Sequence, residues 1–233
     1  MIRRMRTPDP PVAGRTALVA GATGLVGRQI LQELLDDDAV AAVHALVRRP
    51  LGLRHPRLTE HTVDFARLPP LPPVDEAYLA LGTTIKAAGS EAAFRAVDFD
   101  ASLAVACAAQ VAGARRIGVV SAMQADAGSH IFYSRVKGEL EEAVAGLGYE
   151  GVVIARPSLL VGDREALGQP ERPGERIGLH VGRWLKPLIP ANFRPITARD
   201  VARALLRAVP VARGHRVLLS GEMQDSAAPA STS

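Results

Sequence analysis

Residues 16–27 read TALVAGATGLVG, a short apolar run that leads directly into three glycines. The apolar run, Thr16–Ala20, is typical of a buried strand, and the apolar spacing of a helix starts at Leu25, directly after the second glycine. A strand, a glycine turn and a helix in this order are what dinucleotide binding requires. The stretch therefore indicates a dinucleotide site, and the alternative is a turn whose glycines are incidental.

The three glycines have separate expected roles. Gly21 would allow the tight turn, and Gly24 would let backbone amides approach a pyrophosphate at the helix N-terminus. Gly27 would let the helix pack closely on the strand. The expected cofactor contacts of this turn are Gly21, Thr23, Gly24, Leu25, Val26 and Gly27.

Strand-like and helix-like runs continue to alternate along the chain. The expected strands are Thr16–Ala20, Val43–Val47, Thr59–Val63, Ala77–Leu81, Arg116–Val120, Val152–Arg156 and Val217–Ser220. The expected helices are Leu25–Leu35, Glu91–Ala112, Phe132–Ala145 and Ala198–Val209, with Ser90 capping the second and Thr197 the last. This alternation predicts an α/β fold, a Rossmann-like doubly wound parallel sheet with a small C-terminal substrate-side extension.

The expected organisation is one domain with loose ends. Residues 14–221 would form a single NAD(P)-binding Rossmann domain, with the substrate-side extension from about residue 158. Residues 1–13, rich in Arg and Pro, would be a disordered arm, and residues 222–233 a disordered tail.

Composition narrows the class of protein. The chain has 233 residues, 48% hydrophobic and 22% charged, which suits one well-buried domain and excludes disorder throughout. Its one cysteine, Cys107, excludes an internal disulfide or a multi-cysteine metal site, and the six histidines have no ligand spacing. No metal site is therefore predicted.

Charge and hydropathy bear on partners and location. The net charge is +4, and most of the cations are arginines spread along the chain, which favours a phosphate-bearing small ligand as much as nucleic acid. We find no export signal and no apolar run as long as a membrane span. We therefore expect a cytoplasmic protein that binds neither nucleic acid nor a membrane.

The end of the second expected strand bears on cofactor choice. Arg48, Arg49 and Pro50 follow Val47, where a site for NAD would place an acidic residue on the ribose. Arginine can instead pair with a 2′-phosphate and stack on adenine. We expect NADP(H) in preference to NAD(H), unless both arginines are merely solvated.

Tyr133 and Lys137 lie four residues apart on an expected helix, so they share one helix face. A phenol with the ordinary pKa near 10 is a poor proton donor or acceptor at neutral pH unless a cation stabilises the phenolate. Lys137 can supply that cation. The plain alternative is an exposed tyrosine packed along a lysine stem.

The motifs Gly-x-x-Gly-x-x-Gly and Tyr-x-x-x-Lys together resemble the short-chain dehydrogenase/reductase superfamily. Further stretches resemble its atypical branch, which includes the human HIV Tat-interacting oxidoreductase and its bacterial relatives. They are residues 63–65 (VDF), 81–84 (LGTT), 132–139 (FYSRVKGE) and 156–158 (RPS).

This resemblance implies NADPH bound in a Rossmann fold. Asp64 would lie near the adenine, Leu81 and Gly82 against the ribose, and Tyr133 with Lys137 at the nicotinamide. The other residues implied in cofactor binding are Phe65, Thr83, Pro157 and Ser158.

The superfamily also places a catalytic hydroxyl just after the fifth strand. The single hydroxyl there is Ser121, at a position that is one residue early. Ser121 could polarise a carbonyl, or it could simply cap the backbone at the strand end.

We therefore expect an NADP(H)-dependent oxidoreductase that transfers hydride between the nicotinamide and a small carbonyl or alcohol. Tyr133 would donate or accept the proton, with Lys137 and Ser121 assisting. The alternative is an NADPH-binding regulatory or scaffold protein with little or no turnover. The expected partner is a small-molecule substrate, and a homodimer is left open.

Overall fold

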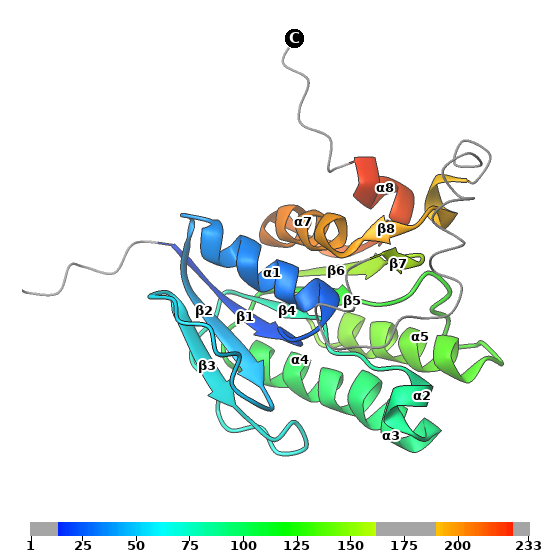
Figure 1. Cartoon of the computed structure of the whole chain (residues 1–233), viewed down its shortest axis with the longest axis horizontal. Coiled ribbons are helices and arrows are strands. Elements are labelled where there is room, and N and C mark those ends of the chain that lie inside the picture. The colour runs from blue at the N-terminus through cyan, green and yellow to red at the C-terminus, as the bar shows by residue number, and fades with distance from the viewer. Residues whose placement is uncertain (1–13, 162–189, 226–233) are drawn as a thin grey trace, which may run out of the picture.

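The computed structural model describes residues 14–161 and 190–225 and shows in them a sheet of seven parallel strands (Figure 1). Their spatial order is β3 (Leu58–Thr62), β2 (Val40–Val47), β1 (Arg15–Ala20), β4 (Glu76–Leu79), β5 (Arg116–Val120), β6 (Gly151–Arg156) and β9 (Gly214–Leu219). Each expected strand is present, and the α/β Rossmann-like class is confirmed. The strand order reverses at β1, so the carboxyl ends of β1 and β4 form the switch point at which open α/β sheets bind their ligands.

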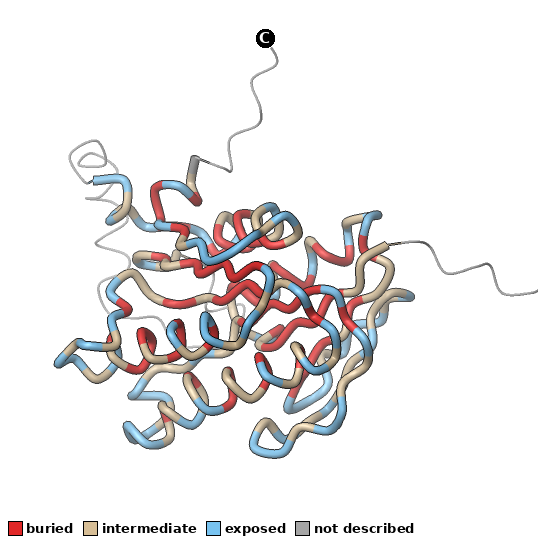
Figure 2. Tube along the Cα trace, turned by 180° about the vertical axis from the view of Figure 1, so that it is seen from behind, coloured by how far each residue is buried: buried red, intermediate tan, exposed pale blue. Residues whose placement is uncertain are grey.

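Helices cover both faces of the sheet. On one face lie α1 (Leu25–Asp36) and α7 (Ala198–Ala208), and on the other α4 (Ser102–Val111) and α5 (Phe132–Ala145). Figure 2 shows the central strands as the most continuously buried part of the chain. Small and branched apolar residues fill both layers, such as Leu34 with Leu205 in the first core and Val105 with Leu140 in the second.

The expected helix Glu91–Ala112 is interrupted. Ser90 caps its start as predicted, its hydroxyl accepting a bond from the N–H of Ala93. The helix then runs as α3 (Glu91–Arg95), a π-helix η1 (Ala96–Ala101) and α4. A π-helical turn holds more residues than an α-helical turn, so it changes which side chains face inward. Here Asp98 is fully buried.

Near the carboxyl end of β6 lie the short pair β7 (Leu160–Val161) and β8 (Ile196–Thr197), the 3₁₀ turn η4 (Ala191–Phe193) and α8 (Ser220–Asp225). The 3₁₀ turn η5 (Val209–Val211) leads instead to the amino end of β6, where a Cβ at Gly151 would lie 2.5 Å from the carbonyl oxygen of Ala212. Thr197 caps α7 as predicted, accepting from the N–H of Asp200 at 3.1 Å. Helix α8 occupies the first residues of the segment expected as a loose tail from Glu222. The expected arm 1–13 and the rest of that tail lie outside the described residues.

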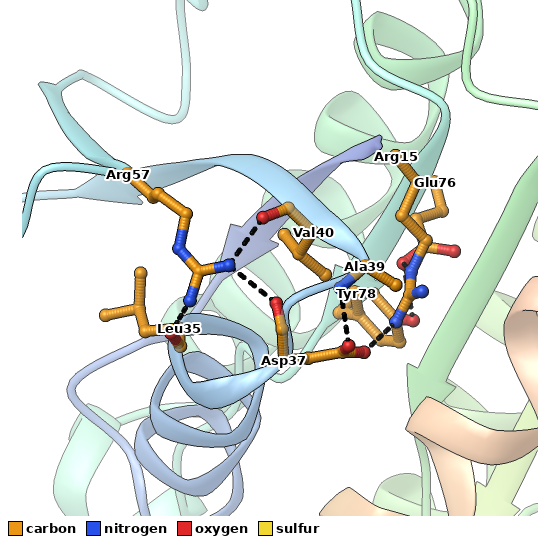
Figure 3. Close-up of polar contacts among 8 residues, drawn as sticks. All are labelled: Arg15, Leu35, Asp37, Ala39, Val40, Arg57, Glu76 and Tyr78. Atoms are coloured by element: carbon orange, nitrogen blue, oxygen red, sulfur yellow. Dashed lines mark hydrogen bonds and ion pairs between the residues drawn. The ribbon is translucent and has the colours of Figure 1, made fainter. Parts of the chain in front are cut away.

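A polar network closes the amino end of the sheet (Figure 3). The guanidinium of Arg15 donates to Glu76 Oε1 at 2.9 Å and to Asp37 Oδ2 at 2.5 Å, and the hydroxyl of Tyr78 donates to Glu76 Oε1 at 3.0 Å. Burial raises the pKa of Glu76, and the charge of Arg15 opposes that change. Burial, and then the neighbouring carboxylate of Glu76, raises the pKa of Tyr78 well above its ordinary value.

The same network fixes the end of α1. Arg57 donates from Nη1 to the carbonyl oxygens of Asp37 at 2.6 Å and Val40 at 2.8 Å, and from Nη2 to that of Leu35. The last carbonyls of a helix have no partner within the helix, so a cation placed here stabilises its C-terminus. The amino end of the sheet is therefore held by groups that satisfy one another.

Two general features complete the description. None of the helices in the described ranges is long and apolar enough to span a membrane. Within the same ranges, no group of three or more His, Cys, Asp or Glu side chains is placed to hold a metal ion.

Candidate cofactor and catalytic site

The glycine turn joins β1 to α1 at the carboxyl end of β1, and its glycines differ in the space around them. Gly21 has a φ of +91°, and a Cβ there would lie 2.3 Å from the carbonyl oxygen of Ala80. A Cβ at Gly27 would lie 2.0 Å from the carbonyl oxygen of Gly21. Both positions therefore require glycine for the turn and for close packing of the helix on the strand.

Gly24 is different. A Cβ there would meet its nearest atom, the carbonyl oxygen of Gly21, at 3.3 Å, a tight contact that a shift of a few tenths of an ångström would relieve. Gly24 is the N-cap of α1 and has no side chain to satisfy the first helical N–H groups. These N–H groups, at Leu25 and Val26, and the exposed Thr23 are available to a phosphate at the positive end of the helix dipole.

The arginines expected to select the cofactor lie at the same edge of the sheet. Arg48 and Arg49 directly follow β2 and are exposed. Asp64 and Phe65 follow β3, which runs parallel to β2, so their backbones reach the same edge. The carboxylate of Asp64 is exposed and accepts a bond from the N–H of Ala66 at 3.0 Å.

The segment after β4 lies against the glycine turn. The N–H of Ala80 donates to the carbonyl of Ala20 at 2.8 Å, which continues the pairing of β1 with β4 into the turn. Leu81, Gly82 and Thr83 follow directly. A Cβ at Gly82 would lie 3.5 Å from a carboxylate oxygen of Asp98 and 3.9 Å from the ammonium of Lys137. The structure thus brings the expected ribose segment next to the expected catalytic lysine.

Tyr133 and Lys137 occupy the first turns of α5, at the exact bounds predicted for that helix. Tyr133 is 37% exposed, and its ring centroid lies 5.5 Å from that of the buried Phe94. Lys137 is buried, and its Nζ lies 2.6 Å from Oδ1 of Asp98. Phe94 and Asp98 are also four residues apart, on the helical segment α3–η1. Phe94 faces Tyr133 and Asp98 faces Lys137 across the contact between this segment and α5.

Asp98 is the site residue that the sequence analysis missed. Its Oδ2 accepts a hydrogen bond from the N–H of Thr83 at 2.9 Å, while its Oδ1 contacts Lys137. One sequence signal points to it, the i, i+4 spacing from Phe94. An aspartate in a helical run is otherwise read as solvated, and its partner is 39 positions away in the chain.

The two expected serines are engaged within the protein. The hydroxyl of Ser121 donates to the buried carboxylate of Glu141, which also binds the guanidinium of Arg156 at 2.6 Å. The N–H of Ser158 donates to the hydroxyl of Ser220 at 2.7 Å, and the hydroxyl of Ser158 donates to the carbonyl of Arg194 at 2.5 Å. Ser121 therefore ties β5 to α5 and β6, and Ser158, which follows the buried Pro157, ties the end of β6 to α8.

Comparison with known proteins places the chain in a family. No family model matches it. The protein named "Protein FMP52, mitochondrial" from Candida albicans is 30% identical over 200 residues, which are 82% of this chain and 86% of the relative. The chain belongs to the FMP52 family. The FMP52 protein of Coccidioides immitis is 34% identical over 209 residues, 83% of this chain and 85% of the relative.

Two expectations change with this family. The relatives carry the FMP52 name, not that of the Tat-interacting oxidoreductase. They are also named mitochondrial, which contradicts the cytoplasmic location expected from the sequence; that prediction is wrong. It rested on the lack of a recognisable export signal and of a membrane-spanning run, and neither feature decides between cytoplasm and mitochondrion.

Solved structures of low sequence identity share the fold of this FMP52-family chain. MoeE5, solved with UDP-glucose and NAD, has a TM-score of 0.65 and 21% identity, covering 87% of this chain and 75% of its own. A short-chain dehydrogenase family protein from Francisella tularensis has a TM-score of 0.65 and 14% identity, covering 91% of this chain and 100% of its own. These likenesses support the Rossmann-like fold.

Proposed function

We propose that this FMP52-family protein is an NADP(H)-dependent oxidoreductase of the atypical short-chain dehydrogenase/reductase branch. Its substrate would be a small carbonyl compound or the corresponding alcohol. The observation that carries the proposal is the placement of Lys137, four residues after Tyr133 on α5, beside Gly82 in the segment that follows β4. Ligands of open α/β sheets bind at the carboxyl ends of the strands, where the glycine turn also lies.

The residues present fit a dinucleotide. The α1 N-terminus with its open Gly24 suits the pyrophosphate, and the exposed Arg48 and Arg49 suit a 2′-phosphate. When bound, the nicotinamide supplies or takes up the hydride. Asp64, Leu81 and Thr83 would line the adenosine and ribose portions.

Tyr133 is the proposed proton donor in reduction and the acceptor in oxidation. Its side chain is partly exposed, so its hydroxyl can reach a substrate oxygen, and its ring is held against Phe94. In the reductive direction its proton would go to the carbonyl oxygen as hydride reaches the carbonyl carbon. Lys137 would stabilise the phenolate left behind and bind ribose hydroxyls.

One observation favours the alternative, an NADPH-binding regulatory or scaffold protein. The hydroxyl of Ser121, proposed to assist at the substrate oxygen, is committed to Glu141. A site without that donor could bind cofactor and still turn over slowly. The experiment is a titration with NADPH followed by measurement of its oxidation over a panel of aldehydes and ketones. Binding with substrate-dependent oxidation is expected; binding without oxidation of any carbonyl would favour the scaffold, and absence of binding would exclude both.

A further inference from the structure

Most of the exposed large apolar side chains in the described residues lie at the carboxyl end of the sheet. Ile131 is 62% exposed and directly precedes α5, which carries the partly exposed Tyr133. Leu159 follows β6 and is exposed, and Phe193 in η4 is 58% exposed. Ile85 is exposed at the start of α2 (Ile85–Ala88), which follows β4. Apolar surface grouped at one edge of a protein is typical of a place where a ligand binds.

Backbone contacts bring the segments that carry these side chains together. Strands β4, β5 and β6 are parallel neighbours, so the segments after them leave the sheet at the same end (Figure 1). The N–H of Met123, after β5, donates to the carbonyl of Pro157, after β6, at 3.1 Å. The N–H of Ile196 donates to the carbonyl of Leu159 at 3.0 Å, so the segment after η4 lies against the segment after β6. The apolar side chains therefore share the end of the sheet at which α5 begins.

The arginines of these segments are already bonded to groups of the protein. Their partners are Glu139 for Arg95 at 2.5 Å, the carbonyl of Ser129 for Arg135 at 2.9 Å, and Glu141 for Arg156 at 2.6 Å. A substrate that carries a phosphate or a carboxylate would need a cation with free donors. Lys86, next to Ile85, is exposed and has no such partner among the described residues, so its contribution has to be tested.

We propose that the substrate is a neutral aldehyde or ketone with a long apolar chain, an inference that rests on the proposed function. Its carbonyl group would lie at Tyr133, and its chain would cover the apolar edge residues, a name we use for Ile85, Ile131, Leu159 and Phe193. In the reduction the carbonyl carbon gains the hydride that NADPH loses. The carbonyl oxygen gains the proton of the Tyr133 hydroxyl, which solvent then replaces, and the products are the alcohol and NADP⁺.

The first test measures kcat/KM with NADPH for the straight-chain aldehydes from propanal to octanal. Burial of one methylene group predicts a gain of about two- to fourfold, or about 30- to 1000-fold from propanal to octanal. Pentanal and 4-oxobutanoate have similar lengths and differ in charge. Pentanal should be preferred by at least about tenfold, because a carboxylate would lose its hydration against apolar side chains. Lys86→Ala should leave this preference unchanged.

Two substitutions test where the chain of the substrate lies. Ile131→Ser and Phe193→Ser replace exposed side chains, so neither removes core packing. Ile131 is the N-cap of α5, a position that serine favours, so the start of the helix is kept. Each substitution should reduce the gain from propanal to octanal by about fourfold or more, the contribution of one buried methylene group. Val211→Ser replaces an exposed apolar residue of η5, near the amino end of β6, and is the matched control that should keep the full gain.

A binding measurement that needs no turnover uses NADPH together with 1-octanol, two reduced compounds that cannot react with each other. The Cδ1 methyl signal of Ile131, identified by its loss in Ile131→Ser, should shift as 1-octanol is added. The corresponding signal of Ile30, which is fully buried in the core beneath α1, should stay in place. Ethanol at the same concentration should move neither signal, because it is too short to cover the apolar edge residues.

Failure of this inference is distinct from failure of the proposed function. If NADPH binds and none of the aldehydes oxidises it, the proposed function fails and the inference fails with it. If the aldehydes are reduced with equal kcat/KM from propanal to octanal, the proposed function stands and the apolar substrate class is wrong. The same conclusion would follow from a preference for 4-oxobutanoate that Lys86→Ala removes, from an Ile131 methyl signal that 1-octanol does not move, or from a full gain in both serine variants.

Discussion

The amino end and the carboxyl end of the central sheet differ in whether their polar groups already have partners within the protein. At the amino end Arg15, Asp37, Glu76 and Tyr78 bond to one another. At the carboxyl end the helix N-terminus at Gly24 carries no side-chain cap. A network whose donors and acceptors match is complete without a ligand, whereas uncapped helical N–H groups have capacity for one.

This difference indicates which residues stabilise the fold and which bind the cofactor in a Rossmann-like chain. Substitutions at the amino end should change the free energy of unfolding and leave cofactor binding alone. Substitutions of ligand-facing groups at the carboxyl end should do the reverse. The experiments on Tyr133, Glu76→Ala and Gly24 therefore measure both quantities.

The largest effect is expected for Tyr133→Phe. Only the hydroxyl is removed, and a positioned acid or base contributes about 10²- to 10⁴-fold to rate. Turnover of a verified carbonyl substrate should fall by that factor, with NADPH affinity and melting temperature unchanged because the ring still packs on Phe94. Near-normal turnover would exclude proton transfer by Tyr133.

The next effect is expected at the other end, for Glu76→Ala. The substitution leaves the buried hydroxyl of Tyr78 without its acceptor and Arg15 without one of its two carboxylates. Stability should fall by about 2–4 kcal/mol. The melting temperature should fall on the order of 5–15 °C, and NADPH affinity measured on the folded protein should stay the same. Weaker cofactor binding would break the division between the two ends.

Replacement of Arg48 and Arg49 by alanine tests cofactor choice. A charge-assisted contact with a phosphate predicts about a ten- to hundredfold preference of wild type for NADPH over NADH. The double replacement should remove that preference through weaker NADPH binding and leave NADH binding unchanged. Titrations with both cofactors decide. Equal affinities in wild type would contradict the assignment.

The smallest effect is a pH dependence at the amino end. Burial raises the pKa of Glu76 above the ordinary carboxyl value, so the folded state holds that proton to higher pH than the unfolded chain does. Its contribution is therefore fully present below the unfolded pKa and is lost as pH rises through the folded pKa. Relative to Glu76→Gln, wild type should lose stability as pH rises from about 4.5 toward neutrality. Thermal denaturation of both proteins across this range checks the sign, and a wild type that gains stability relative to Glu76→Gln as pH rises would contradict it.

Much of the fold could be predicted from the sequence, because local pattern decides it. The strand Arg116–Val120 and the helix Phe132–Ala145 have the predicted bounds. A buried strand shows in the sequence as a continuous apolar run, and an amphipathic helix as apolar residues three and four positions apart. Strand β4 begins one residue earlier than predicted, at Glu76, because a charged residue does not read as buried. Its burial depends on Arg15, 61 positions away.

The site was predictable in part. The glycine turn and the pair Tyr133 and Lys137 are local motifs, and the structure brings the segment after β4 to them. Asp98 and the hydrogen bond from Ser121 to Glu141 depend on how separate elements pack, and the π-helical turn at Asp98 interrupts a run that local spacing reads as one helix. Tertiary partners of this kind leave no periodic signal.

The measurement that tests the central claim most directly is the NADPH affinity of Gly24→Ala, taken with its melting temperature. A Cβ at Gly24 would need the carbonyl oxygen of Gly21, 3.3 Å away, to shift by only a few tenths of an ångström, whereas at Gly27 a Cβ would collide with backbone at 2.0 Å, so Gly24→Ala should fold and Gly27→Ala should be strongly destabilised. We expect the melting temperature of Gly24→Ala to stay within about 4 °C of wild type. We expect its NADPH dissociation constant to rise at least about tenfold, since the new methyl group would stand where a pyrophosphate approaches the backbone. A folded Gly24→Ala that binds NADPH as tightly as wild type would contradict the claim that this end of the sheet is the cofactor site.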